Sequence, residues 1–170
     1  MAKRLKNKIA IVTGGGQTPG ETIGNGRATA LLFAREGASV LVTDKNLASA
    51  NETVAMITDE GGKAIAIEMD VANESDCESM AAQCIEHFGR IDILQNNVGI
   101  GFRDGSATKL KEEDWDRIFD VNLKSMFLTC KHVLPRMREN QSGAIIYPGD
   151  ALLVKNLKPF VDMLALPSLF

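Results

Sequence analysis

The chain has 170 residues, of which 45% are hydrophobic and 24% charged, and its formal net charge at pH 7 is -3. This balance predicts one soluble globular domain with a sizeable core and argues against a disordered chain. The acidic balance gives no broad basic field for nucleic acid, and the short cluster of Lys3, Arg4, Lys6 and Lys8 is typical of a solvated leader. No apolar run is long enough to span a bilayer, and the start lacks the layout of a secretory signal. We therefore expect a cytoplasmic protein with neither nucleic acid nor membrane as a partner.

The cysteines point to a reducing compartment. Cys77, Cys84 and Cys130 are odd in number and lie in segments with helical patterning, which disfavours a disulfide framework. Cys84 and His87 are three residues apart, but no second pair at ligand spacing accompanies them. We therefore predict no metal site and a Cys84 thiol packed in the core.

Strand-like and helix-like segments alternate along the chain without repeats. Apolar runs predict five strands, at residues 9–12, 40–43, 64–69, 91–95 and 144–147. Between them, apolar residues recur at helical spacing, with Gly37 placed to end the first helix and Asn73 to cap the third. The face expected to be buried in the last helix carries Trp115, Phe119, Leu123, Met126, Phe127, Cys130, Val133 and Leu134, and Pro135 is expected to end or bend it. The alternation predicts an α/β fold: a Rossmann-like, doubly wound, three-layer parallel sheet, incomplete at five strands.

Glycines crowd the turn that follows the first strand. Residues 13–16 read Thr-Gly-Gly-Gly, and Gly24, Asn25 and Gly26 then open the first helix. Glycine lets the backbone turn sharply and approach a ligand closely, while the unpaired N–H groups of a helix N-terminus attract an anion. The segment is therefore predicted to bind the pyrophosphate of a dinucleotide.

Asp44 directly follows the second strand. An acid there is placed to accept hydrogen bonds from the adenosine ribose hydroxyls, and its charge would repel an added 2′-phosphate. This favours NAD over NADP, although Lys45 can partly offset the repulsion. The alternative is an ordinary acid in a turn, which leaves the glycines and the spacing unexplained.

With these residues in place, the chain resembles the short-chain dehydrogenase/reductase family over about its first 146 residues. Thr13, Gly14, Gly24 and Gly26 match the family's Thr-Gly-x-x-x-Gly-x-Gly, but only across an insertion. The outer glycines of the family pattern are six apart, whereas Gly14 and Gly26 are twelve apart. Residues 17–22 therefore look like an extra loop, which can alter how the phosphates are capped without abolishing binding.

The resemblance assigns roles to further residues. It implies that Asp70 and Val71 flank the adenine, and that the segment 96–99, with Asn97 and Gly99, braces the central strands and borders the cofactor. Val98 replaces the family's usual alanine there. Asn122 matches a helix asparagine that holds a water in the family's proton relay. The alternative for Asn122 is a surface residue of poor helix propensity.

The rest of the family's proton relay has no counterpart in the sequence. The resemblance places its serine at Asp150, its tyrosine at Met163 and its lysine at Pro167. Tyr147 is the only tyrosine, and its place on a strand argues against its serving with Lys155 or Lys158, which are more simply solvated charges.

Residues 147–170 depart from the family and form a divergent apolar tail to a dinucleotide-binding domain at residues 1–146. A coding sequence whose reading frame is cut short or shifted near residue 147 would explain this tail. The family would add a helix beside residues 115–134, so an apolar face is expected to be uncovered, which favours aggregation, homo-oligomers or rescue by a partner.

Three functions follow from these observations. The family resemblance implies an NAD-dependent oxidoreductase that moves a hydride between the cofactor and a small alcohol or carbonyl compound. The absent relay favours the other two, a module that binds dinucleotide without turnover or an inactive fragment.

Overall fold

The computed structural model describes residues 3–17, 20, 22–101 and 108–147. Its centre is a five-stranded sheet with the order β3-β2-β1-β4-β5, in which every neighbouring pair is parallel. The strands are β1 (Ile9–Thr13), β2 (Ser39–Asp44), β3 (Lys63–Glu68), β4 (Ile93–Gln95) and β5 (Ala144–Ile146). The predicted fold class and the five strands are confirmed, with boundaries that differ by up to two residues. The largest difference is at β4, which begins at Ile93 rather than at residue 91.

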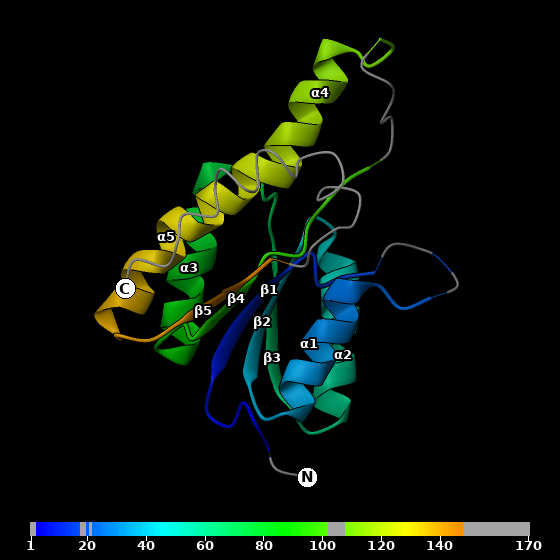
Figure 1. Cartoon of the computed structure of the whole chain (residues 1–170). Helices are drawn as coiled ribbons and strands as arrows, with labels where there is room; N and C mark the ends of the chain where they lie inside the picture. Colours follow the sequence, from blue (N-terminus) through cyan, green and yellow to red (C-terminus); the bar gives the residue numbers. More distant parts are fainter. Residues whose placement is uncertain (1–2, 18–19, 21, 102–107, 148–170) are drawn as a thin grey trace.

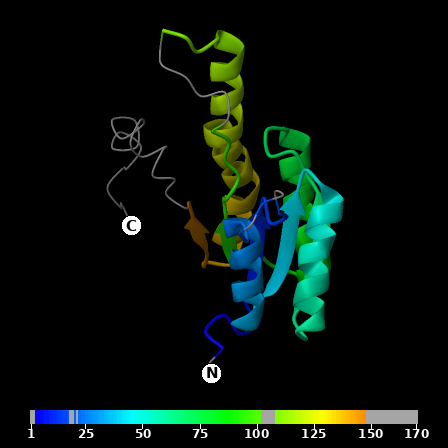
Figure 2. The same cartoon turned by 90° about the vertical axis from the view of Figure 1, so that its right-hand side faces the viewer.

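Helices cover both faces of the sheet, which gives three layers (Figures 1 and 2). On one face α1 (Asn25–Arg35) packs beside α2 (Leu47–Asp59), and on the other α3 (Glu74–Phe88) packs beside α5 (Ser125–Glu139). Successive residues of a strand point to opposite faces. In β1, Ile9 and Ile11 accordingly join the core under α3 and α5, whereas Ala10 and Val12 join the core under α1 and α2. A strand buried on both faces needs the unbroken apolar run that the sequence shows.

The helix ends follow their local signals. The Asn73 side chain accepts hydrogen bonds from the backbone N–H groups of Ser75 and Asp76, as expected of an N-cap. Gly37 follows α1 with a φ of +95°, a conformation that residues with a side chain rarely adopt. Leu32, an apolar residue of α1 next to the buried Leu31, is half exposed.

The last helical stretch differs from its prediction. The helices α4 (Glu112–Phe119) and α5 are joined without a break by a π-helical turn, η1 (Asp120–Lys124). Trp115 and Phe127, predicted to be buried, are 51% and 63% exposed, while Ser125, Leu128, Thr129, Val133 and Met137 face the core. The pattern misled because Ser125 and Thr129 can be buried once their hydroxyls find acceptors: Ser125 donates to the Val121 carbonyl, and Thr129 donates to the Asn96 side chain.

Pro135 does not end α5, which continues to Glu139. Proline removes one hydrogen bond of a helix, and the buried side chains of Val133 and Met137 hold the helix on both sides of it. Of the helices among the described residues, none is long and apolar enough to cross a membrane.

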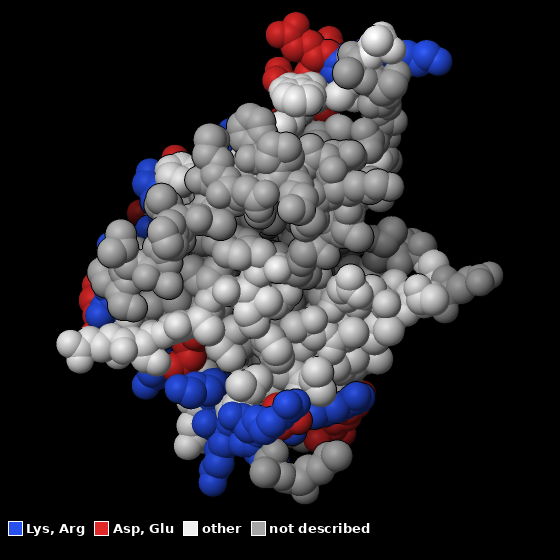
Figure 3. Space-filling view, viewed as in Figure 1, with Lys and Arg blue, Asp and Glu red and all other residues white. Residues whose placement is uncertain are grey.

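Basic side chains gather at the end of the molecule near the N-terminus, below the sheet in Figure 3, where acidic side chains lie among them. Arg4 pairs with Glu36, and Arg35 pairs with Glu60. Because each partner is an acid from the same end of the molecule, the leader and this end form a mixed surface rather than a single positive field.

Candidate functional site

A cleft of about 1390 Å³ opens at the carboxyl ends of the strands. Loops that follow β1, β2, β3 and β4 line it, and α4 extends past the sheet beside it (Figure 1). In an open parallel sheet, this is where ligands bind. All ten predicted site residues line this one cleft: Gly14, Gly24, Asn25, Gly26, Asp44, Asp70, Val71, Asn97, Gly99 and Asn122.

The outer glycines of the interrupted motif meet although they are twelve positions apart in the sequence. Gly14 has a φ of +62°, and the carbonyl oxygen of Gly14 occupies the place where a side chain on Gly26 would start. A residue larger than glycine at position 26 would therefore separate α1 from the turn after β1. The Asn97 amide donates to the same Gly14 carbonyl at 3.1 Å, which ties the turn to the end of β4.

The N-terminus of α1 forms one end of the cleft. Gly24 is its N-cap and supplies no side-chain cap, and no acidic residue lies in the first turn. The helix dipole leaves partial positive charge on these first N–H groups. An anionic group is therefore the ligand that this end of the cleft would stabilise.

Asp44 binds two backbone groups at the end of β2. One carboxylate oxygen accepts the Gly16 N–H at 2.9 Å, and the other accepts the Asn46 N–H at 2.9 Å. A carboxylate has about four acceptor positions, so both oxygens retain capacity for a sugar hydroxyl. Asp44 is thus an acid in a turn, which was the alternative interpretation of this residue, and it also lines the cleft.

Asp70 lies on the neighbouring loop and is paired with Lys45. The Lys45 ammonium is 3.1 Å from the Asp70 carboxylate, so the nearest cation to Asp44 in sequence is engaged elsewhere. The Ala72 N–H, followed by Lys45, lowers the pKa of Asp70 below its usual value. Asp70 is therefore charged at neutral pH, and together with Asp44 it makes this end of the cleft acidic. Val71 beside it is 6% exposed and packs into the core under α3.

The segment after β4 braces the central strands. The Asn97 N–H donates to the Thr13 hydroxyl, and the Asn96 side chain accepts a 2.8 Å hydrogen bond from the Thr129 hydroxyl of α5. Val98 stands close to Gly14, where a side chain on Gly14 would strike its methyl group. The segment consequently fixes the turn after β1 and α5 relative to each other.

Asn122 is buried, so it is not the surface residue of the alternative interpretation. It lies in η1, and its side chain makes both hydrogen bonds to the backbone of Ile100: the amide donates to the carbonyl at 2.9 Å, and its oxygen accepts the N–H at 2.8 Å. Single π-helical turns are frequent at functional sites. Asn122 holds the strand-to-helix segment at the wall of the cleft.

The proton relay is not found among the described residues. The positions that the resemblance gives it, Asp150, Met163 and Pro167, lie outside them, as do Lys155 and Lys158. The Tyr147 hydroxyl is 3.0 Å from the Cys130 sulfur, and burial followed by this contact raises the pKa of Tyr147 above its usual value. A raised pKa makes the phenol harder to ionise, which is the reverse of what proton transfer requires.

The two buried thiols of α3 are not reactive groups of the cleft. Burial raises the pKa of Cys77 and Cys84 to about 12, so both are neutral packing groups. Within the described ranges, no three His, Cys, Asp or Glu side chains converge as a metal site would require.

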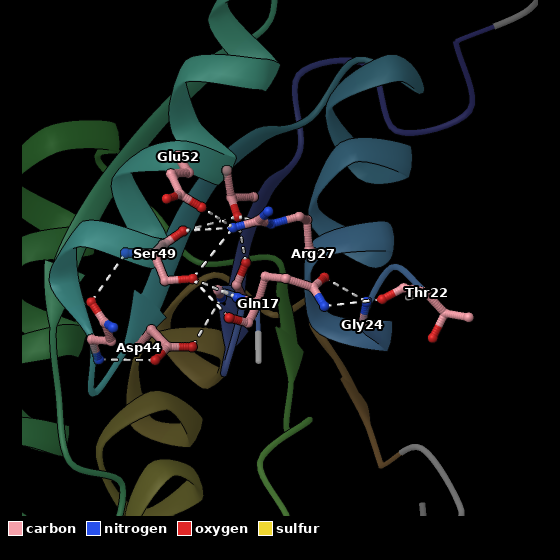
Figure 4. A network of polar contacts seen from close by, with 11 residues as sticks. Gln17, Thr22, Gly24, Arg27, Asp44, Ser49 and Glu52 are labelled. Atoms are coloured by element: carbon pink, nitrogen blue, oxygen red, sulfur yellow. Dashed lines mark hydrogen bonds and ion pairs between the residues drawn. The ribbon is translucent and has the colours of Figure 1, made fainter. Parts of the chain in front are cut away.

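The sequence analysis missed a polar network beside the cleft (Figure 4). Arg27 reaches from α1 to α2, where it donates to the Thr53 hydroxyl at 2.9 Å and pairs with Glu52. Gln17 joins Ser49 to Gly24 in the same network. A usable signal existed, since Ser49 and Thr53 are four apart and therefore share a face of α2.

Comparisons with known proteins agree with this architecture. The sequence profile of the family described as short chain dehydrogenase matches residues 8–148. The (2S)-[(R)-hydroxy(phenyl)methyl]succinyl-CoA dehydrogenase subunit BbsD of Thauera aromatica is 37% identical over 142 residues, which cover 84% of this chain and 54% of that protein. The 3-oxoacyl-[acyl-carrier-protein] reductase FabG of Thermotoga maritima is 34% identical and is covered to 55%.

Two solved structures extend the comparison. A short-chain dehydrogenase/reductase from Burkholderia xenovorans has a TM-score of 0.81 at 40% identity, covering 85% of this chain and 56% of that one. A metagenomic short-chain oxidoreductase in complex with NADP has a TM-score of 0.77 at 28% identity, covering 85% of this chain and 62% of that one. The chain thus spans about half the length of the curated relatives that it matches.

Proposed function

Because the chain belongs to the short-chain dehydrogenase family, we propose that it forms the dinucleotide-binding part of an NAD(P)-dependent oxidoreductase. The observation that carries this proposal is the meeting of the glycine turn, the N-terminus of α1 and the Asp44 carboxylate in one cleft. The glycine turn lets the ligand approach the backbone closely, the N-terminus of α1 suits a pyrophosphate, and the Asp44 carboxylate suits a ribose diol.

Individual roles follow from position in the cleft. Gly14, Gly24, Asn25 and Gly26 would surround the pyrophosphate, and Asp70 with Val71 would border the adenine. Asn97, whose amide donates to the Gly14 carbonyl, and Gly99 would border the remainder of the dinucleotide. Asn122 would hold the Ile100 segment in place for the reacting groups.

We propose NAD rather than NADP as the preferred cofactor. Asp44 is negative and lies where the adenosine ribose would bind, and the paired Asp70 adds a second carboxylate near it. A 2′-phosphate would face both charges. Lys45, which would attract that phosphate, is already engaged by Asp70. One metagenomic relative was solved in complex with NADP, so the proposed preference for NAD rests on the charges of this cleft.

Turnover by this chain is proposed to be slow or absent. When bound, a nicotinamide cofactor supplies or accepts a hydride at an alcohol or carbonyl carbon of a small molecule. General acid–base catalysis contributes about 10²–10⁴-fold in rate. Tyr147, with its raised pKa and its contact with Cys130, is not suited to that role. We therefore propose a binding module of dehydrogenase lineage, with an inactive fragment as the outcome if binding fails.

Titration with NADH, followed by its fluorescence and by thermal unfolding, tests the proposal. A ligand that binds only the folded chain raises the unfolding temperature. We expect NADH to protect the folded chain and NADPH to protect it less. Consumption of NADH with a panel of carbonyl compounds then separates a binder from a catalyst. Folded protein with no affinity for either dinucleotide would contradict the proposed function, and rapid turnover would contradict the dead relay.

A cytoplasmic location is proposed on the three free cysteines of the described chain. Thiols persist in a reducing compartment. Subcellular fractionation of the tagged protein tests this, and recovery outside the cytoplasm would contradict it.

A further inference from the structure

Removing residues 18–23 restores the family spacing of the glycine motif just as removing residues 17–22 does, and the side chain of Gln17 bridges the two ends of the stretch 18–23. Its Oε1 accepts the Gly24 N–H at 2.7 Å, and its Nε2 donates to the Thr22 carbonyl at 3.0 Å. If residues 18–23 were removed, Gln17 would be bonded directly to Gly24, and the twelve-residue spacing of Gly14 and Gly26 would become six. The hydrogen bond therefore spans the place where the family pattern has a peptide bond.

Gln17 is itself fixed to the rest of the fold. Its N–H donates to the Ser49 hydroxyl at 2.7 Å, and that hydroxyl donates back to the Gln17 carbonyl at 3.2 Å. Ser49 lies in the first turn of α2 and is 7% exposed. Arg27 also donates to the Ser49 hydroxyl, so this hydroxyl has both acceptor positions and its proton engaged.

The neighbouring turn is equally well anchored. Gly15 donates to the Thr43 carbonyl and accepts from the Thr53 hydroxyl, while Gly16 donates to Asp44. The turn after β1 is thus fastened to β2 and α2. Gly24, at the start of α1, is connected to it in sequence only through the inserted residues.

We propose that Gln17 is a positioning residue for the pyrophosphate. Its carboxamide replaces the missing direct peptide link and fastens Gly24, at the N-terminus of α1, to the turn after β1 (Figure 4). Gln17 does not need to touch the phosphates for this role, because it acts through Gly24. The inference rests on the proposed function for its ligand, while the geometry of Gly24 is independent of it.

A deletion provides the sharpest test. Gln17→Ala in the full chain should weaken binding of NADH and of ADP about tenfold, the loss of one well-made hydrogen bond to a positioned group. Binding of adenosine, which lacks phosphates, should change less than about twofold. In a chain lacking residues 18–23, a covalent bond holds Gly24, so the same substitution should change NADH binding less than about twofold.

Gln83→Ala is the matched control. Gln83 lies on α3 away from the cleft, is partly exposed, and donates to the Ser79 hydroxyl at 2.9 Å. It should leave all three affinities unchanged. Equal losses for NADH and adenosine, or equal losses in the full and shortened chains, would overturn the positioning role, as would full affinity in Gln17→Ala.

A second readout does not depend on the cofactor. Hydrogen exchange at the Gly24 amide should accelerate about tenfold or more in Gln17→Ala and stay unchanged in Gln83→Ala, measured on the free chain by NMR. If Gln17→Ala does not fold, Gln17→Glu keeps the acceptor for Gly24 and should retain the slow exchange. Fast exchange at Gly24 in the wild-type chain would overturn the inference, whereas failure of NADH binding with a protected Gly24 would overturn only the proposed function.

Discussion

Asp44 serves the backbone and the cleft at once. Its two oxygens hold Gly16 and Asn46, so it shapes the turn after β1 as well as the cleft wall. A neutral side chain at this position would lose both backbone contacts and the charge that would face the ribose. The consequence at the scale of one residue is a coupling between cofactor choice and local backbone structure.

Asp44→Ala should weaken NADH binding about tenfold to a hundredfold, because hydrogen bonds to a charged group contribute about 1.5–3 kcal/mol each. NADPH binding should weaken less or improve, since the repulsion of its 2′-phosphate is removed. Fluorescence titration with both cofactors measures the ratio. Asp59→Ala, an exposed acid at the end of α2, is the control. An unchanged NADH to NADPH ratio would contradict the role of Asp44.

Asn122→Ala should lower the free energy of unfolding by about 1–3 kcal/mol, because the N–H and the carbonyl of Ile100 lose their side-chain partner. Urea unfolding followed by circular dichroism measures the loss. Asn51→Ala, at an exposed position of α2, should cost much less. Equal losses in the free energy of unfolding for the two substitutions would show that the Asn122 side chain contributes no more to stability than an exposed asparagine does.

At the scale of an element, α3 shows how far local sequence determines a helix. Asn73 begins it, Gly89 ends it with a φ of +81°, and Cys77, Met80, Ala81 and Cys84 form its buried stripe. The segment from α4 to α5 shows the opposite, because η1 and two buried hydroxyl residues set which face meets the core. That choice depends on partners from β4 and its loop, such as Asn96 and Ile100.

The buried thiols of α3 should resist modification in the folded chain. Their pKa of about 12 leaves them protonated at pH 8, and both are fully buried. A thiol-specific reagent should therefore modify Cys130 first, with Cys77 and Cys84 reacting only in denaturant. Because these pKa values lie above those of the unfolded chain, their contribution to stability is present below about pH 9 and is lost as pH rises toward 12. Rapid reaction of three thiols without denaturant would contradict this packing.

At the scale of the molecule, an apolar surface is left open beside β5. Phe127 and Cys130 are three apart on α5, and the Tyr147 hydroxyl contacts Cys130. Phe127 and Tyr147 are 63% and 49% exposed. We call the surface of Phe127, Cys130 and Tyr147 the β5-side patch. Among the described residues it lies on α5, beside which the sequence analysis expects an uncovered apolar face.

Phe127→Ser should reduce self-association through the β5-side patch, because it removes the most exposed aromatic ring of that surface. Light scattering or sedimentation at several concentrations measures this. Leu32→Ser, which removes a half-exposed apolar residue from α1 on the other face of the sheet, is the control. Equal association in wild type and Phe127→Ser would show that this patch does not drive self-association.

The sequence by itself determined the parallel sheet, because strands buried on both faces need unbroken apolar runs, and it determined the helix ends, because Asn73 and Gly37 act within one turn of the backbone. It also identified the cleft residues, since their positions at strand ends bring them to one edge of the sheet. Only the tertiary structure decided the buried face of α5, the pairing of Lys45 with Asp70 and the bridge from Gln17 to Gly24. These depend on side chains that meet across different elements, and such meetings leave no periodic trace in the sequence.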